Sequence, residues 1–313
     1  MPLLKIILLA IVQGLAELLP VSSSAHVVVA EKLLGLDPSS PQMTLVLVML
    51  HTGTMFAVIV YFWPQWRRAY FASTDAFKRF TIRAIWATFL TGLIGYPIMK
   101  VIEHALKSSA GDILIPSCSA FHTADIESLF SHLELVAPAL FLAGLLILWA
   151  GLKERNAEAA SASNYERSLT RAGENVTFAQ AGWMGAVQGL CLPFRGFSRS
   201  GATISTGLLT GSARDRAERF SFALAVIITP LAIAKEALRL LHSVHAGKVG
   251  CGPSVDLHAS FLAAGLGMVF SFIAGLAALR WLSSWLESGK WYLFGIYCLV
   301  ASCVVFYLHH IGY

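Results

Sequence analysis

Long apolar blocks constrain the fold of this chain more than any other feature. Six blocks of about 18 to 24 residues occupy 43–63, 83–102, 134–151, 218–241, 258–279 and 290–309. Each is long enough to cross the hydrocarbon core of a bilayer, about 30 Å thick, as a helix. Only 13% of the residues are charged, against about 25% in soluble domains, which excludes an ordinary soluble enzyme. We therefore expect an all-α polytopic membrane protein with six transmembrane helices.

Two further apolar stretches, 3–34 and 176–212, are interrupted near their middle. Pro, Gly and Ser break the first stretch at 19–24 and the second at 193–198, which leaves halves too short to span a bilayer. Broken backbone at membrane depth is tolerated only where protein buries it or where it lines a wet cavity. We predict that both stretches form re-entrant helical hairpins.

The distribution of Lys and Arg predicts the orientation of the chain. Fourteen of them flank the spans on one side and six on the other, so the positive-inside rule makes the first side cytoplasmic. Both termini and the loops 103–133 and 242–257 are then periplasmic, and a Cys118 to Cys251 disulfide between those loops is a hypothesis. Because the basic residues lie in short runs between apolar blocks, we expect no nucleic-acid partner.

The two interrupted stretches also share sequence. The segment 12–15 recurs at 187–190, and Gly35 corresponds to Gly211. Each half contains one hairpin, which returns to its own side of the membrane, followed by three spans, which do not. The second half therefore starts on the opposite face of the membrane. We predict inverted repeats within a single integral membrane domain, at about 1–152 and 176–313, joined by a cytoplasmic loop at 153–175. Chance similarity of short apolar strings is the alternative.

The first hairpin carries polar residues that an apolar segment does not need. Gln13 and Glu17 are four residues apart and share a helix face, and an ionisable group such as Glu17 costs about 2.5 kcal/mol or more at the bilayer centre. Ser22, Ser23 and Ser24 open the second half, and a helix cap is the alternative role for any one of them. His26 lies on the face of Ser23, where it is either functional or structural.

The second hairpin combines glycines, hydroxyl groups and an arginine. Arg199 offers a planar fork that suits two phosphate oxygens, and the N–H groups at a helix start favour phosphate. Two such starts facing each other would suit a diphosphate. Mutual neutralisation of Arg199 and Glu17 is the alternative.

These segments resemble the signature regions of a known family. The segments 13–17 (QGLAE), 19–26 (LPVSSSAH) and 196–203 (GFSRSGAT) are similar to those of the bacterial undecaprenyl pyrophosphate phosphatases, which are associated with bacitracin resistance. The resemblance covers nearly the whole chain. It implies an inner-membrane enzyme that hydrolyses undecaprenyl pyrophosphate to undecaprenyl phosphate and phosphate, recycling the lipid carrier of cell-wall synthesis. It also implies a divalent cation, Mg²⁺ with Ca²⁺ as the alternative.

The resemblance also implies roles for individual residues. Glu17 would hold the metal with the substrate's phosphates, Ser23 would be the nucleophile, His26 an acid or base, and Arg199 the phosphate clamp. Direct attack by water that Glu17 activates is the alternative to a phosphoserine. The remaining residues expected to bind substrate are Gln13, Ser22, Ser24, Ser198, Ser200, Gly201 and Thr203.

The second signature departs from the family pattern, and the sequence allows a second function. Pro193 is displaced from its usual place in the second signature, and Arg195 is either a second phosphate contact or an anchor for lipid headgroups. A polyprenyl-phosphate transporter or flippase is the alternative function, because inverted repeats with broken helices are common in carriers. The expected partners are the polyprenyl pyrophosphate and membrane lipids, and a homodimer is compatible with the sequence.

Overall fold

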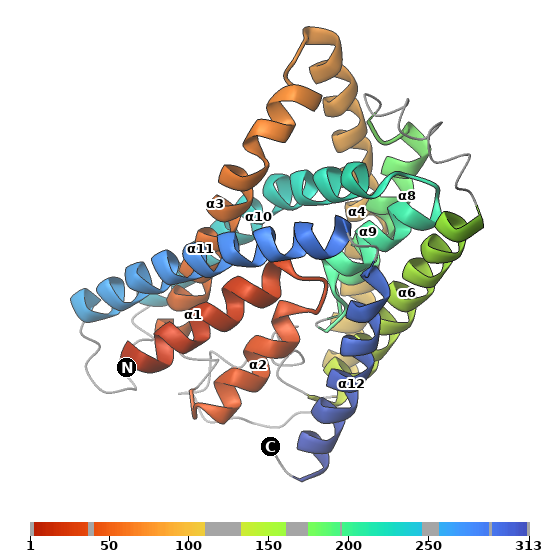
Figure 1. Ribbon diagram of the computed structural model, residues 1–313. Helices are drawn as coiled ribbons and strands as arrows, with labels where there is room; N and C mark the ends of the chain where they lie inside the picture. The colour runs from red at the N-terminus through yellow and green to blue at the C-terminus, as the bar shows by residue number, and fades with distance from the viewer. Residues whose placement is uncertain are drawn as a thin grey trace.

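Helices account for nearly all of the computed structural model, which describes residues 3–36, 41–109, 133–160, 175–194, 196–245, 257–287 and 290–311. Arg195, Cys118 and Cys251 lie outside these residues, as does most of the expected 103–133 loop. The described ranges contain ten helices and no strand. The helices (Figure 1) are α1 (Leu3–Leu18), α2 (Ser23–Leu33), α3 (Pro41–Ala69), α4 (Thr74–Ser109), α6 (Leu133–Ala160), α8 (Phe178–Cys191), α9 (Arg199–Leu209), α10 (Arg214–His245), α11 (Leu257–Glu287) and α12 (Trp291–His310).

Five of these helices are long and apolar enough to cross a membrane. The candidate spans lie in α3, α4, α6, α11 and α12, at Met43–Ala69, Thr74–Ile102, Leu135–Asn156, Phe261–Leu282 and Trp291–His310. The described residues therefore fit the expected multi-pass membrane protein with helices as its regular structure. The remaining expected span, 218–241, lies within the 32-residue α10.

The break in the first hairpin lies where the sequence predicts it. Helix α1 ends at Leu18, two residues before Pro20, whose ring and missing N–H do not fit a helix interior. Helix α2 begins at Ser23 because the Ser22 side chain accepts a hydrogen bond from the backbone N–H of Ala25 at 3.4 Å. The chain thereby folds back on itself, and α1 and α2 lie beside each other (Figure 1).

The second hairpin is built in the same way. Helix α8 begins with a capping box, in which Thr177 and Gln180 bond to each other's backbone N–H groups, and it ends at Cys191 before Pro193. Helix α9 begins at Arg199, with Ser198 accepting from the N–H of Gly201 at 3.2 Å. Ser22 and Ser198 therefore cap corresponding helices of the two halves.

Each hairpin packs its first helix against a long helix of the other half. Helix α1 meets α11 at Gly14, where a Cβ atom would lie 2.7 Å from the carbonyl oxygen of Ser271. Helix α8 meets α4 at Gly189, where a Cβ atom would lie 2.7 Å from the carbonyl oxygen of Thr91. Small residues let helix backbones approach closely within membranes, so these glycines set the matched positions of the two hairpins.

The core surrounds the point where the hairpins meet. Helices α6 and α12 pack side by side (Figure 1), and a Cβ atom on Gly151 or Gly295 would lie 2.5 Å from a backbone nitrogen of the other helix. Trp291 is fully buried at the start of α12, and its indole N–H donates to Ser205 of α9 at 3.0 Å. This apolar packing fixes α9, and with it the residues at its N-terminus, relative to the first hairpin.

Candidate functional site

A polar cluster lies where α1, α2, α3 and α9 come together. Its members are Gln13, Glu17, Ser23, His51 and Arg199, and Glu17 is the member that contacts all the others. Arg199 Nη2 lies 3.1 Å from Glu17 Oε1. The Ser23 hydroxyl donates to Glu17 Oε2 at 2.5 Å. One carboxylate thus joins the two hairpins and bonds to the hydroxyl at the start of α2.

The polar cluster is completed from α3, which brings in a residue that sequence reasoning missed. The Gln13 amide donates to Glu17 Oε2 at 3.2 Å and lies 2.9 Å from His51 Nδ1. His51 Nδ1 is itself 3.7 Å from Glu17 Oε2. An ionisable residue inside an apolar span is a functional candidate by default, so the sequence did contain a signal for His51.

Reciprocal hydrogen bonds hold the two hairpins together beside the polar cluster. The Ser24 hydroxyl accepts from the backbone N–H of Gly196 at 3.1 Å. In the opposite direction, the Ser200 hydroxyl donates to the carbonyl oxygen of Leu19 at 3.3 Å. Ser24 and Ser200 therefore each bond to the backbone of the neighbouring hairpin in this structure.

Two turn residues adopt backbone conformations that favour glycine. Gly196 has a φ of +96°, and a Cβ atom there would lie 2.5 Å from the carbonyl oxygen of Val136. Ser22 has a φ of +67°, a conformation sparsely populated by residues with a Cβ atom. Such strain is characteristic of functional sites where the surroundings hold it in place. Here it directs the N-terminus of α2 toward the polar cluster.

Other predicted binding residues of the second hairpin contact α6, α10 or the backbone of α9 itself. The Thr203 hydroxyl bonds to the carbonyl oxygen of Arg199 at 2.8 Å and to the Ser221 hydroxyl of α10 at 2.5 Å. A Cβ atom on Gly201 would lie 2.6 Å from Ile147 of α6. Together with the cap Ser198, these residues position α9, and of this segment only Arg199 reaches Glu17.

His26 lies on α2 but its ring faces α12. Nδ1 lies 2.8 Å from the carbonyl oxygen of Ser22, and Nε2 lies 2.6 Å from the hydroxyl of Tyr297. Within the described chain, His26 makes no hydrogen bond to Glu17 or Ser23. Tyr297 was also missed by sequence reasoning, because a tyrosine in an apolar span carries no distinguishing signal.

The electrostatics of the polar cluster favour an anion. Helices α2 and α9 both begin here, and the N-terminus of a helix carries about half a positive charge. Arg199 adds a full charge with a side chain that is 25% exposed, and it faces the single carboxylate of Glu17, which is 16% exposed. Both helix starts and the guanidinium lie beside Glu17, and helix N-termini and arginine side chains are groups that bind phosphate.

The sequence match decides the family. The family described as "Bacitracin resistance protein BacA" matches residues 6–304, which is nearly the whole chain. This chain belongs to the BacA family. The predicted family membership is therefore confirmed.

Relatives of the chain are similar along its full length. The protein called undecaprenyl-diphosphatase 2 of Acinetobacter baylyi is 50% identical over 305 residues, covering 97% of both chains. Undecaprenyl-diphosphatase 1 of Burkholderia pseudomallei and undecaprenyl-diphosphatase 2 of Burkholderia thailandensis are each 32% identical over 323 residues, covering 99% of both chains.

The donors present in this BacA-family chain fit a metal only together with phosphate. Among the described residues, no group of three His, Cys, Asp or Glu side chains could hold a metal ion. The polar cluster offers one carboxylate, from Glu17, beside the Ser23 hydroxyl. Mg²⁺ is commonly held by one or two carboxylates together with substrate phosphates, so Glu17 fits that mode.

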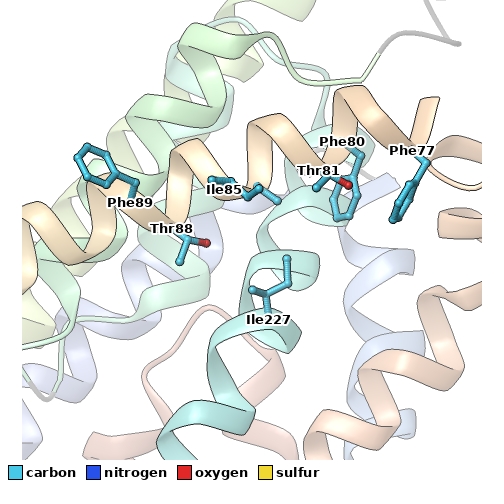
Figure 2. Close-up of a pocket in the computed structure, with 8 residues that line it drawn as sticks. Phe77, Phe80, Thr81, Ile85, Thr88, Phe89 and Ile227 are labelled. Carbon is cyan, nitrogen blue, oxygen red and sulfur yellow. The ribbon is translucent and has the colours of Figure 1, made fainter. Parts of the chain in front are cut away.

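An apolar pocket lies elsewhere, between α4 and α10. It has a volume of about 500 Å³, and Figure 2 shows Phe89, Ile85 and Phe77 along α4 with Ile227 of α10 facing them. The lining is almost entirely apolar, apart from the hydroxyls of Thr81 and Thr88. Hydrocarbon suits such a surface and a diphosphate does not, which leaves the polar cluster as the candidate site for chemistry.

Proposed function

We propose that this protein is a membrane phosphatase that hydrolyses undecaprenyl pyrophosphate to undecaprenyl phosphate and phosphate. The observation that carries the proposal is that Glu17 contacts both Ser23 and Arg199 where the helices α2 and α9 begin. A hydroxyl, a base and a phosphate-binding arginine are thus in one place. The names of full-length relatives support the same substrate.

Arg199 has N–H donors that Glu17 does not use and that can bind the substrate before the reaction. Only Nη2 is engaged by Glu17 among the contacts of the described chain, whereas a guanidinium has five N–H donors. The remaining donors and the backbone N–H groups at the start of α9 would bind the terminal phosphate. Preorganised donors of this kind supply most of the catalysis of phosphoryl transfer.

Ser23 is positioned to act as the nucleophile. Its hydroxyl proton passes to Glu17 Oε2, 2.5 Å away, as the serine oxygen attacks the terminal phosphorus and the bond to the bridging oxygen breaks. Undecaprenyl phosphate leaves, and water then hydrolyses the phosphoserine to release phosphate and regenerate the hydroxyl. Direct attack by water on the same phosphorus is the competing route.

We assign the divalent cation to Glu17 and the substrate's phosphates. A cation bound there would neutralise charge on the phosphoryl oxygens. Mg²⁺ suits one carboxylate plus phosphate oxygens, whereas Ca²⁺ takes six to eight oxygen ligands. We therefore expect Mg²⁺ to be preferred.

The proposed arrangement in the inner membrane has six spans and two re-entrant hairpins in inverted repeats. Matched caps at Ser22 and Ser198, and matched close approaches at Gly14 and Gly189, support the repeat. The start of α1 and the end of α12 lie in the lower half of Figure 1, and the turn between α3 and α4 lies at its top. Arg67 and Arg68 lie just before that turn, so the positive-inside rule supports a cytoplasmic turn and periplasmic termini.

A phosphatase is favoured over a carrier because of the Ser23 to Glu17 hydrogen bond. A carrier needs to bind phosphate, but it has no use for a nucleophile beside a base. The test is to reconstitute the protein in vesicles with undecaprenyl pyrophosphate and Mg²⁺, and to follow both free phosphate and the position of intact lipid. Phosphate release supports the proposal, and movement of intact lipid across the bilayer without release overturns it.

A further inference from the structure

The environment of His26 determines which ring nitrogen carries the proton. Nδ1 lies 2.8 Å from the backbone carbonyl oxygen of Ser22. A carbonyl oxygen can only accept a hydrogen bond, so Nδ1 must be the donor and carry a hydrogen. In the neutral imidazole, Nε2 then has no hydrogen and offers its lone pair.

Tyr297 of α12 supplies the partner for that lone pair. Its hydroxyl lies 2.6 Å from His26 Nε2, and since Nε2 is the acceptor, the tyrosine donates. The two rings are nearly parallel, with an interplanar angle of 11° and centroids 5.7 Å apart. The imidazole is therefore held at both nitrogens and along its plane.

Helix α12 is itself fixed to the first hairpin at this level. The thiol of Cys298, the residue next to Tyr297, donates to the carbonyl oxygen of Pro20 at 3.4 Å. The tyrosine is thus anchored to the same turn that carries Ser22. It remains 47% exposed, so the pair borders the surroundings of the protein rather than its core.

His26 and Tyr297 have a role distinct from that of the polar cluster. Ser23 already has its base in Glu17, so His26 is not needed to take the serine proton. Its Nδ1–H instead bonds to the carbonyl oxygen of Ser22, the residue directly before Ser23, at 2.8 Å.

We propose that Tyr297 is a positioning residue: its hydroxyl holds His26 with the proton on Nδ1, and that N–H fixes the turn that presents Ser23 to Glu17. This inference rests on the proposed function for the role of Ser23, although the proton placement does not. Tyr297 acts only through His26 and does not itself touch the diphosphate.

The test compares Tyr297→Phe, which removes only the hydroxyl, with Tyr307→Phe on the same helix. Tyr307 is 61% exposed, and its side chain has no polar contact within the described chain. Nitrogen NMR of labelled protein, with His26 assigned by its loss in His26→Gln, should show an unprotonated Nε2 in the wild type. That signal should shift in Tyr297→Phe and stay in place in Tyr307→Phe. A protonated Nε2 in the wild type, or no shift in Tyr297→Phe, overturns the inference.

Kinetics separate positioning from a general loss of structure. Tyr297→Phe should lower kcat about tenfold, a part of the 10² to 10⁴ that a positioned acid or base contributes, with little change in KM and with thermal unfolding equal to that of Tyr307→Phe. Unchanged kcat would overturn the inference while leaving the phosphatase intact. A wild type that releases no phosphate would overturn the proposed function, and the NMR result would still decide the proton placement.

Discussion

Arg199 Nη2 lies 3.1 Å from Glu17 Oε1, and this ion pair joins residues 182 positions apart in the chain. The sequence left open whether Arg199 neutralises Glu17 or binds phosphate. Because the pair uses one of the five guanidinium donors, both functions are compatible. The pair orients the arginine before substrate arrives, so less ordering is required on binding.

Replacing Arg199 with Lys should separate charge from geometry. Lysine keeps the positive charge but loses the planar fork, so we expect kcat/KM to fall by about 10²-fold, the scale of losing a preorganised donor. Arg219→Lys is the control, because Arg219 pairs with Asp215 within α10 at 3.0 Å, away from the polar cluster. Steady-state phosphate release measures both. Full activity of Arg199→Lys would show that charge alone suffices.

Replacing Ser23 with Ala should abolish covalent turnover. With the nucleophile gone, we expect kcat to fall by at least about 10²-fold, and a rapid acid quench of wild type with labelled substrate should trap phosphoserine. Ser22→Ala removes a helix cap, at a cost of about 1 kcal/mol of stability, together with the contact of that hydroxyl with Ser24 at 3.3 Å. If Ser23→Ala keeps most of its activity, direct attack by water is the route.

His51 should contribute to activity although no motif revealed it. It lies 3.7 Å from Glu17 Oε2 and 2.9 Å from the Gln13 amide, so His51→Ala removes a polar neighbour of both. We expect kcat/KM to fall about tenfold, equivalent to about 1.4 kcal/mol of transition-state stabilisation. Thr52→Ala is the matched control, since its hydroxyl bonds to the carbonyl oxygen of Val48 on its own helix. Equal activity of the two variants would exclude a role for His51.

Close helix packing at α8 should be intolerant of a single methyl group. In Gly185→Ala the added Cβ would lie 2.2 Å from the carbonyl oxygen of Ala87 on α4, and backbone cannot give way cheaply. We expect destabilisation of about 1–3 kcal/mol, the usual cost of overpacking, seen as a lower unfolding temperature in detergent. Gly92→Ala, where a Cβ would meet nothing within 4 Å, should unfold like the wild type. Equal temperatures for both variants would contradict the packing described.

Much of the fold was predictable because its causes are local. Pro20 precedes three serines and Pro193 lies three residues before Gly196, and such clusters of helix-breaking residues allowed both breaks to be placed from sequence. Single prolines without such neighbours, at 64, 97, 138 and 230, lie inside helices. The length of α4 could not, because hydropathy marks the apolar 83–102, whereas the helix runs over Thr74–Ser109 and includes polar turns at both ends.

The candidate site was predicted where its residues share a motif. Glu17, Ser23 and Arg199 belong to the two signature segments, and the family they indicated is confirmed. His51 and Tyr297 come from α3 and α12, and their positions depend on tertiary packing that no single segment encodes. Ser24, Ser200 and Thr203 have roles set by contacts between the hairpins and with α10, which sequence spacing does not reveal.

The most direct test of the account is phosphate release from undecaprenyl pyrophosphate by purified protein in detergent, with and without Mg²⁺. Wild type, Glu17→Gln and Arg199→Ala are compared at equal folded concentration. We expect Mg²⁺-dependent release by the wild type and a loss of at least about 10²-fold in both variants. Wild-type protein that binds the lipid without releasing phosphate, or variants that keep full activity, would contradict it.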